Sequence, residues 1–286
     1  MMLNRSMAWP AIMALAMAGP ASVAHGAFIF PVEDWAVHNG TSVVSDGGTN
    51  SPTFTPADDN MTVMGTFPNV RLADDGDFVA VTTTLTLDTR TGATGVNALN
   101  TQLRFGLFDG PAGPVVAEDT PNRGVFIEYS NAGGLIREAD PAQVDPFIFP
   151  INNIGNGTAD AEGDSIQGAD IGPVDFTLTL TLNAGMLDVA GQISGTDSVS
   201  GNPFLSTFSA SGYAPMAAGF DFDFNRVGFA FRNNVNAPNG TLNDVIVTTN
   251  VPEASPWILA TAVVVVRLSI GPRMRRALRR RGHGQR

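Results

Sequence analysis

The sequence contains no cysteine and no lysine, and its 16 basic residues are all arginine. The absence of cysteine excludes disulfides, thiolate nucleophiles, iron–sulfur clusters and cysteine-ligated zinc. Histidine is scarce: His25 and His283 lie near the two ends, so His38 is the only histidine of the central region. No Gly-x-Ser-x-Gly motif accompanies His38. A hydrolase of the Ser-His-Asp type is therefore disfavoured.

The charge of the chain is unevenly distributed. Residues 27–250 hold 26 acidic residues and seven arginines, a net charge of −19, whereas eight arginines fall between Arg267 and Arg286. A region this acidic repels phosphate backbones, which disfavours nucleic-acid binding, and it attracts cations. The contrast predicts a basic tail with a role of its own behind a single domain that is long enough to fold without disulfides.

Residues 1–26 have the pattern of a secretory signal peptide. Arg5 supplies a positive n-region, residues 11–18 form a short apolar stretch, and Gly19 and Pro20 end it. Small residues then offer cleavage after position 24 or after position 26. This pattern predicts export through the secretory machinery, with a mature domain over residues 27–250.

Residues 251–286 combine three parts in order: a short motif, an apolar run over residues 257–266, and an arginine cluster. The motif is Val251, Pro252, Glu253, Ala254 and Ser255, and the cluster includes Arg273, Arg275, Arg276, Arg279, Arg280 and Arg281. This tail resembles the PEP-CTERM sorting tails of Gram-negative bacteria. The resemblance implies an exosortase-type processing enzyme as a partner, a transient inner-membrane anchor through residues 257–270, and delivery to the cell envelope or outside the cell.

The tail departs from that family at two positions. Ala254 stands where the family usually has a second proline, and Arg267 interrupts the apolar run after ten residues. A spanning helix needs about 20 residues. The alternative is a basic, amphipathic or disordered end that lies on an anionic membrane surface.

Between the two ends, apolar and polar residues alternate with the period of two that is typical of half-buried β-strands. The clearest cases are Phe78–Leu87 and Phe176–Leu182, in which threonines alternate with apolar residues. Similar segments are 103–108, 125–129, 186–193, 204–209, 220–224, 227–231 and 242–247. Residues 183–185 predict a hairpin turn, and the glycine-rich segments 109–114 and 152–157 predict loops. The sequence therefore predicts an all-β, two-sheet antiparallel sandwich of the jelly-roll type, between an N-terminal signal helix and a C-terminal apolar and basic helix.

Three segments carry a further resemblance, to the concanavalin A-like jelly roll of lectins and glucanases. They are 103–108, 222–231 and 242–247, within a likeness that spans about residues 60–250. The resemblance implies a fold rather than an activity, because these segments are packing motifs.

Glycoside cleavage on this fold needs paired carboxylates. The Glu-x-Asp-x-x-Glu strand motif of such glucanases is absent, and Glu128 has no acidic residue two positions away. Asp221 and Asp223 have that spacing, but phenylalanines alternate with them. The pattern favours an ordinary strand whose carboxylates face water.

Two weaker ligand hypotheses remain. Asp74, Asp75 and Asp77 cluster oxygen ligands on one turn, as a calcium site requires, although solvated acidic loops explain them as well. Trp35 and Tyr129 are aromatic residues that could bind carbohydrate, with core packing as the alternative. No cofactor other than calcium is implied. Three functions follow: an exported structural or adhesive protein without an active site, a lectin-like module that binds extracellular polysaccharide, or a glycan-cleaving enzyme.

Overall fold

The computed structural model describes residues 27–38, 43–45, 50–55, 61–87, 103–116, 119–130, 133–148, 150–158, 173–196, 201–231 and 240–251. The regular structure in these ranges is β-strand. The N-terminal strands are β1 (Phe28–Pro31), β2 (Glu33–Val37), β3 (Val43–Ser45), β4 (Thr53–Thr55), β5 (Met61–Arg71), β6 (Phe78–Leu87) and β7 (Leu103–Asp109). The remaining strands are β8 (Arg123–Ser130), β9 (Gly133–Glu138), β10 (Asn152–Gly157), β11 (Val174–Asn183), β12 (Met186–Thr196), β13 (Pro203–Tyr213), β14 (Asp223–Phe231) and β15 (Gly240–Thr249).

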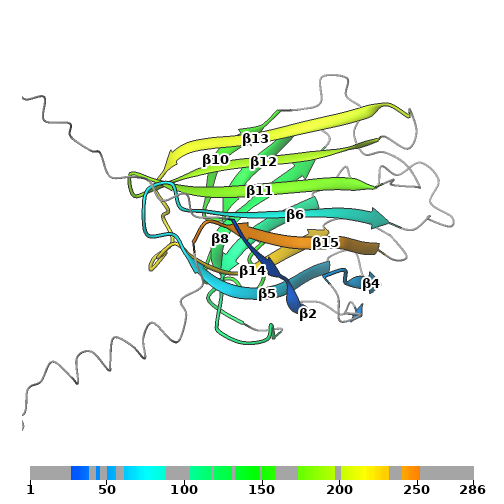
Figure 1. The fold of residues 1–286 in the computed structure, drawn as a ribbon, viewed down its shortest axis with the longest axis horizontal. Helices are drawn as coiled ribbons and strands as arrows, with labels where there is room; N and C mark the ends of the chain where they lie inside the picture. Colours follow the sequence, from blue (N-terminus) through cyan, green and yellow to red (C-terminus); the bar gives the residue numbers. More distant parts are fainter. Residues whose placement is uncertain are drawn as a thin grey trace, which may run out of the picture.

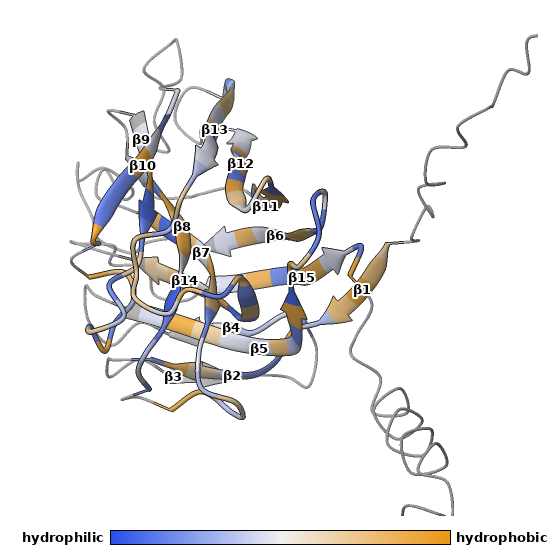
Figure 2. Ribbon diagram, turned by 90° about the vertical axis from the view of Figure 1, so that its left-hand side faces the viewer, coloured by the Kyte–Doolittle hydropathy of each residue, from blue (hydrophilic) through white to orange (hydrophobic). Residues whose placement is uncertain are grey.

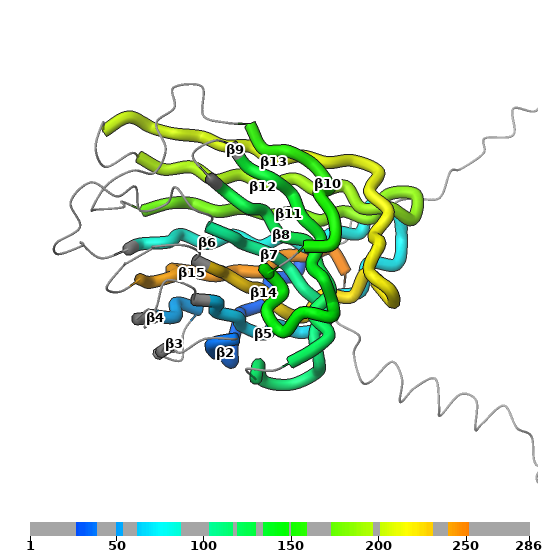
Figure 3. Tube along the Cα trace, turned by 180° about the vertical axis from the view of Figure 1, so that it is seen from behind, coloured from blue at the N-terminus to red at the C-terminus, as the bar shows by residue number. Residues whose placement is uncertain are grey.

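All strand pairs are antiparallel, and the strands form one continuous sheet that folds over into two layers. One layer has the order β13-β12-β11-β6-β15-β4-β3, with β1 also paired to β15. The other, the curved layer, has the order β2-β5-β14-β7-β8-β9-β10. Figure 1 shows β13, β12, β11, β6 and β15 in front of β8 and β10, and Figure 3 shows β7 to β10 from the other side. The predicted all-β antiparallel sandwich is confirmed.

The alternation read from the sequence places the core. In β11, Phe176, Leu178, Leu180 and Leu182 are buried between the layers, whereas Thr177 and Thr179 lie on the opposite side. The rings of Phe105 and Phe229 stack with centroids 4.5 Å apart, and Phe176 meets the edge of Phe105 at 5.8 Å. These rings come from both layers, so they tie the layers together. The hydropathy colours of Figure 2 show the alternation along β6 and β15.

The predicted hairpin at residues 183–185 is confirmed. It joins β11 to β12, and Ala184 and Gly185 both have positive φ, 50° and 75°. Two consecutive positive φ values are the signature of a tight turn whose twist matches that of the paired strands.

Two local predictions are wrong. Residues 152–157 form β10 rather than a loop, between β9 and β13. Gly157 is required there, because a Cβ atom on it would lie 2.5 Å from the ring of Phe208. In the segment 220–224 only the end is a strand: β14 begins at Asp223, and Phe222 has a φ of 60°, which breaks the extended backbone.

The two ends of the described chain lie side by side. β1 pairs with β15, so that Phe28 faces Thr249 and Pro31 faces Ile246. The signal segment before residue 27 and the tail after residue 251 lie outside the described residues, as do the helices predicted for them. Within the described ranges, no helix is long and apolar enough to cross a membrane.

Candidate functional site

The outer face of the curved layer is covered by two loops of the chain itself. They are the 110–122 loop, described except for residues 117–118, and the 139–151 loop, described except for residue 149. Beneath them lies a second apolar cluster, separate from the main core, formed by Met64, Phe108, Val115, Phe126, Ala139, Phe147 and Ala230. Phe147 from the 139–151 loop meets the rings of Phe108 and Phe126 edge-on, at 5.1 Å in both cases.

Glycines in the strands make room for these rings. A Cβ atom on Gly106 would lie 2.6 Å from the Cβ of Phe126, and one on Gly228 would lie 3.0 Å from the Phe147 ring. Gly106 therefore makes room for a ring of the neighbouring strand, and Gly228 lets the loop residue Phe147 approach the sheet closely. As a result, this part of the sheet face is filled by side chains of the protein.

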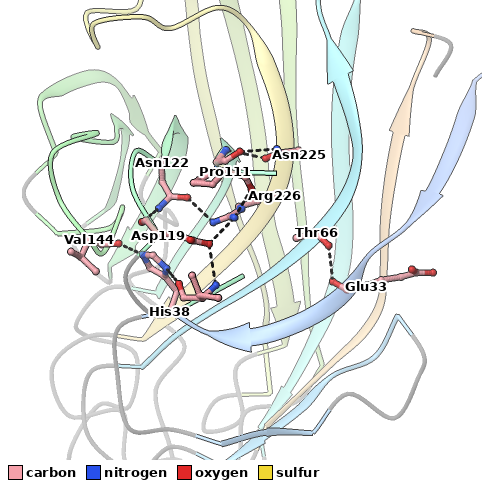
Figure 4. A network of polar contacts seen from close by, with 11 residues as sticks. Glu33, His38, Thr66, Pro111, Asp119, Asn122, Val144, Asn225 and Arg226 are labelled. Atoms are coloured by element: carbon pink, nitrogen blue, oxygen red, sulfur yellow. Dashed lines mark hydrogen bonds and ion pairs between the residues drawn. The ribbon is translucent and has the colours of Figure 1, made fainter. Parts of the chain in front are cut away.

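Arg226 holds the 110–122 loop from below. Its guanidinium group is fully buried, pairs with Asp119 at 2.7 Å, and donates to the Pro111 carbonyl at 2.6 Å and to Asn122 Oδ1 at 3.2 Å. The neighbouring Asn225 exchanges hydrogen bonds with the Gly110 backbone (Figure 4). A buried guanidinium is tolerated because a carboxylate and neutral acceptors surround it.

His38 ties β2 to both loops. The ring is buried, with Nδ1 3.3 Å from the Val116 carbonyl and Nε2 in contact with the Val144 carbonyl (Figure 4). A carbonyl can only accept, so a neutral ring with one N–H can serve one of these two contacts at a time. Burial lowers the pKa of His38, against the opposing effect of Asp145. This histidine therefore has a structural position between two loops rather than the open position of a catalytic base.

A charged triad occupies the outer face beside these loops. Glu128 Oε2 lies 3.0 Å from Arg104 Nη2 and 2.9 Å from Arg137 Nε. Arg104 also donates to the Phe147 carbonyl, and Arg137 donates to Asn153 Oδ1 at 2.6 Å. Glu128 is thus bound between two guanidinium groups, which makes it an anchor of the sheet surface rather than an available acid.

The predicted carboxylate pair lies at the end of the curved layer where the chain termini emerge. Arg71 pairs with Asp221 at 3.8 Å and with Asp223 at 3.5 Å. Burial, together with these two carboxylates, raises the pKa of nearby Asp109 to about 6. The pKa of Asp223 is also raised, by burial and then by Asp221. The expectation that Asp221 and Asp223 simply face water is therefore incomplete, since both belong to an ion-paired cluster.

Glu138 was not singled out by the sequence. It is completely buried, accepts from the backbone N–H of Met216 at 2.9 Å and of Ala217 at 2.7 Å, and accepts from the Tyr213 hydroxyl. Burial and Glu138 raise the pKa of Tyr213. Nothing in the local pattern of β9 distinguishes Glu138 from an exposed strand residue.

The two aromatic residues predicted to bind carbohydrate are core residues. Trp35 is 7% exposed, donates its indole N–H to the Val32 carbonyl and packs in the main core, and Tyr129 is 2% exposed in the same core. A ring that stacks on a sugar must offer a free face. The prediction for Trp35 and Tyr129 is therefore wrong, and the packing alternative is correct.

The acidic turn is organised by its own backbone. Asp77 accepts from the N–H groups of Ala73 and Asp74, both at 2.9 Å, and Asp75 accepts from the N–H of Ala184 at 2.7 Å. In the ranges that the structure describes, no group of three or more acidic, histidine or cysteine side chains is placed to hold a metal. The carboxylates of Asp75 and Asp77 are thus already engaged in holding turns. Of the tail residues, only Val251 is described; Pro252, Glu253, Ala254, Ser255 and the arginine cluster lie outside the described residues.

Comparisons with known proteins give structural likeness only. No protein-family model and no curated protein sequence matches the chain. Arcelin-5, a lectin-like defense protein from Phaseolus vulgaris, is similar with a TM-score of 0.45 and 13% identity, over 79% of this chain and 99% of arcelin-5. A lectin from Bauhinia forficata in complex with GalNAc has a TM-score of 0.42 and 12% identity, over 78% of this chain and 96% of the lectin. A protein of unknown function from Shewanella oneidensis MR-1 has a TM-score of 0.40 and 9% identity, over 85% of this chain and 96% of that one. At such identities the likeness concerns the fold.

Proposed function

We propose that this chain is an exported protein with a non-catalytic β-sandwich body, sorted to the cell envelope or the exopolysaccharide matrix by its PEP-CTERM-like tail, where it has a structural or adhesive role. The observation that carries the proposal is the filled outer face of the curved layer. Phe147 and the two covering loops occupy the part of the sheet over Phe108 and Phe126. The carboxylates on this face, such as Glu128 and Asp119, are bound to arginines.

The position of the chain ends supports processing at both of them. Because β1 is the first strand after the predicted signal peptide and pairs with the last strand, removal of residues 1–26 and of the tail leaves every strand in place. The described residues nearest to the two processing points also lie at one end of the sandwich, where Phe28 faces Thr249. A body anchored through this end would extend away from the membrane.

Mass spectrometry of the mature protein from its native envelope tests the proposal. We expect an N-terminus at position 25 or 27 and a C-terminus before Trp257. The chain has no lysine, so an amine-reactive label attaches once, at the N-terminus, and marks each mature chain. Glu253→Ala is expected to leave the tail attached, whereas Glu33→Ala, a change of the same kind at an exposed residue of β2, is expected to be processed normally. An intact Arg286 in the mature wild-type protein would overturn the sorting role.

The charged triad favours a second candidate, recognition of an extracellular polysaccharide. Two arginines surround the single carboxylate of Glu128, which leaves the triad with a net positive charge within an acidic body. Arg137 and exposed Asn153 lie side by side and offer planar polar groups to a ligand. On a glycan array, Arg137→Gln should then reduce binding of acidic glycans at least about tenfold. The charge-matched control is Arg123→Gln, because Arg123 pairs with Asp109 at 3.8 Å and not with Glu128. Equal binding by both variants, or no binding by the wild type, would remove this candidate.

A further inference from the structure

The last strand leads directly into the sorting motif. β15 ends at Thr249, and the motif begins at Val251, so Asn250 is the only residue between them. Proteolytic cutting usually takes place on exposed, loosely held segments of a chain. Here the junction formed by residues 249–251 is part of the folded body.

Thr249 is the centre of this junction. It is fully buried, and it lies between Phe28 of β1 and Val79 of β6. Its hydroxyl donates to the Phe78 carbonyl at 2.5 Å and accepts from the backbone N–H of Val251 at 3.0 Å. One side chain therefore fixes both the start of β6 and the first residue of the motif.

Asn250 adds a second attachment to the same place. Its side-chain oxygen accepts from the N–H of Phe78 at 2.8 Å, and its side-chain nitrogen donates to the Gly76 carbonyl at 3.0 Å. Val251 itself is partly buried and packs against the main core. Three consecutive residues are thus held by hydrogen bonds or by apolar packing.

We propose that the sandwich clamps the start of its own sorting motif, so that cutting at the motif requires the junction 249–251 to open first. The proposal rests on the proposed function for the meaning of the motif, and on the described contacts for the clamp. A protease binds several residues on both sides of the bond that it cuts, and residues that are bonded to and packed on the body cannot enter its binding site in place. The rate of cutting then follows the population of the opened junction.

The clamp also links the two ends of the chain. Thr249 is covered on one side by β1, whose first residue, Phe28, follows the predicted signal cleavage point closely. The junction is therefore complete only when the N-terminal strand has paired with β15. Cutting of the tail would then be slower in the folded body than in a chain whose β1 has not paired.

A glutamate-specific endoprotease tests the clamp on the full chain in detergent, because Glu253 is the only acidic residue of the tail. Mass spectrometry follows the product that ends at Glu253, relative to the product that ends at Glu128, a buried site that is cut only when the body opens. Thr249→Val and Asn250→Ala each remove two hydrogen bonds, and we expect each to raise this ratio about five- to tenfold.

Asn243→Ala is the matched control. Asn243 lies on the same strand and also donates to β6, to the Thr84 carbonyl and the Thr86 hydroxyl, but close to the opposite end of β15. It is expected to change the ratio less than about twofold. An unchanged ratio in both junction variants, or an equal rise in all three, would overturn the clamp.

Hydrogen exchange of the wild-type chain gives a second readout that needs no variant. The Val251 amide should be protected to a degree similar to the Phe78 amide, and exchange at the rate of a free peptide would overturn the proposal. No sorting enzyme enters either experiment, so a failed clamp leaves the sorting role open. Conversely, an intact Arg286 in the native protein would overturn sorting and leave the clamp in place.

Discussion

The buried carboxylate of Glu138 connects the two layers of the sandwich at the residue scale. Removing an unpaired carboxylate from water costs several kcal/mol, but here two backbone N–H groups and the Tyr213 hydroxyl replace the lost water. The donors come from the end of β13 and the segment after it, whereas Glu138 ends β9. One side chain thus positions a stretch of irregular backbone against a strand of the other layer.

Asp109 contributes a pH dependence of stability. Its pKa of about 6 in the folded chain lies above the ordinary value of 3.8. The folded chain therefore binds more protons than the unfolded chain between these two pH values. The stability that protonated Asp109 gives to the folded state is fully present below about pH 4 and is lost as the pH rises through about 6. Asp109→Asn should raise the unfolding free energy at pH 8 by about 1 kcal/mol, since solvent screening reduces the effect of a half-buried group, and should change little at pH 4. Urea denaturation at the two pH values measures the difference.

Asp188→Asn is the control of opposite sign. Hydrogen bonds from Asn183 and from the Gly212 N–H lower the pKa of Asp188, so the ionised form stabilises the fold. This variant is expected to be less stable than the wild type at pH 8, with the difference fading as the pH falls through the lowered pKa. If Asp109→Asn were destabilising at pH 8, the raised pKa of Asp109, caused by burial and then by Asp221 and Asp223, would be wrong.

At the scale of the strands, the sequence predicted strand positions best where one face of the strand is buried and the other is exposed to solvent. β6 begins and ends at the predicted residues, and the predicted segments of β7 and β11 lie within strands only slightly longer. Alternation fails as a guide where both faces are covered. In β7, six consecutive residues are buried, because odd positions face the main core and even positions face the covering loops. β10 was missed because Gly157 is required by its close approach to Phe208, which is distant in sequence.

The candidate site shows the same limit more clearly. Glu128 has no acidic residue two positions away along its own strand. Its partners come from the strands on either side: Arg104 from β7 and Arg137 from β9. His38 was recognised as unusual because it is alone, yet the carbonyls that it contacts lie 78 and 106 residues further along the chain. Partners of this kind depend on strand order and register, which local patterns do not contain.

At the scale of the whole molecule, the acidic body surrounds a small number of buried arginines. Arg226 and Arg104 are buried beneath or beside the covering loops, where they neutralise Asp119 and Glu128. The remaining excess of acidic residues gives the region 27–250 its charge of −19. Like charges spread over one compact body repel one another and oppose the folded state.

This repulsion predicts that salt stabilises the protein. Raising NaCl shortens the distance over which charges interact, from about 30 Å at 0.01 M to about 3 Å at 1 M. We expect the melting temperature of the full chain to rise by about 2–4 °C between low salt and 0.5 M NaCl, which corresponds to about 1 kcal/mol for a chain of this size.

A comparison of calcium chloride with NaCl at equal ionic strength tests whether Asp74, Asp75 and Asp77 bind calcium. Because the carboxylates of Asp75 and Asp77 already accept backbone N–H groups, calcium should give the same rise as NaCl. A larger rise in calcium chloride would show that the protein binds the ion. A melting temperature that falls with NaCl would show that charge repulsion does not limit stability.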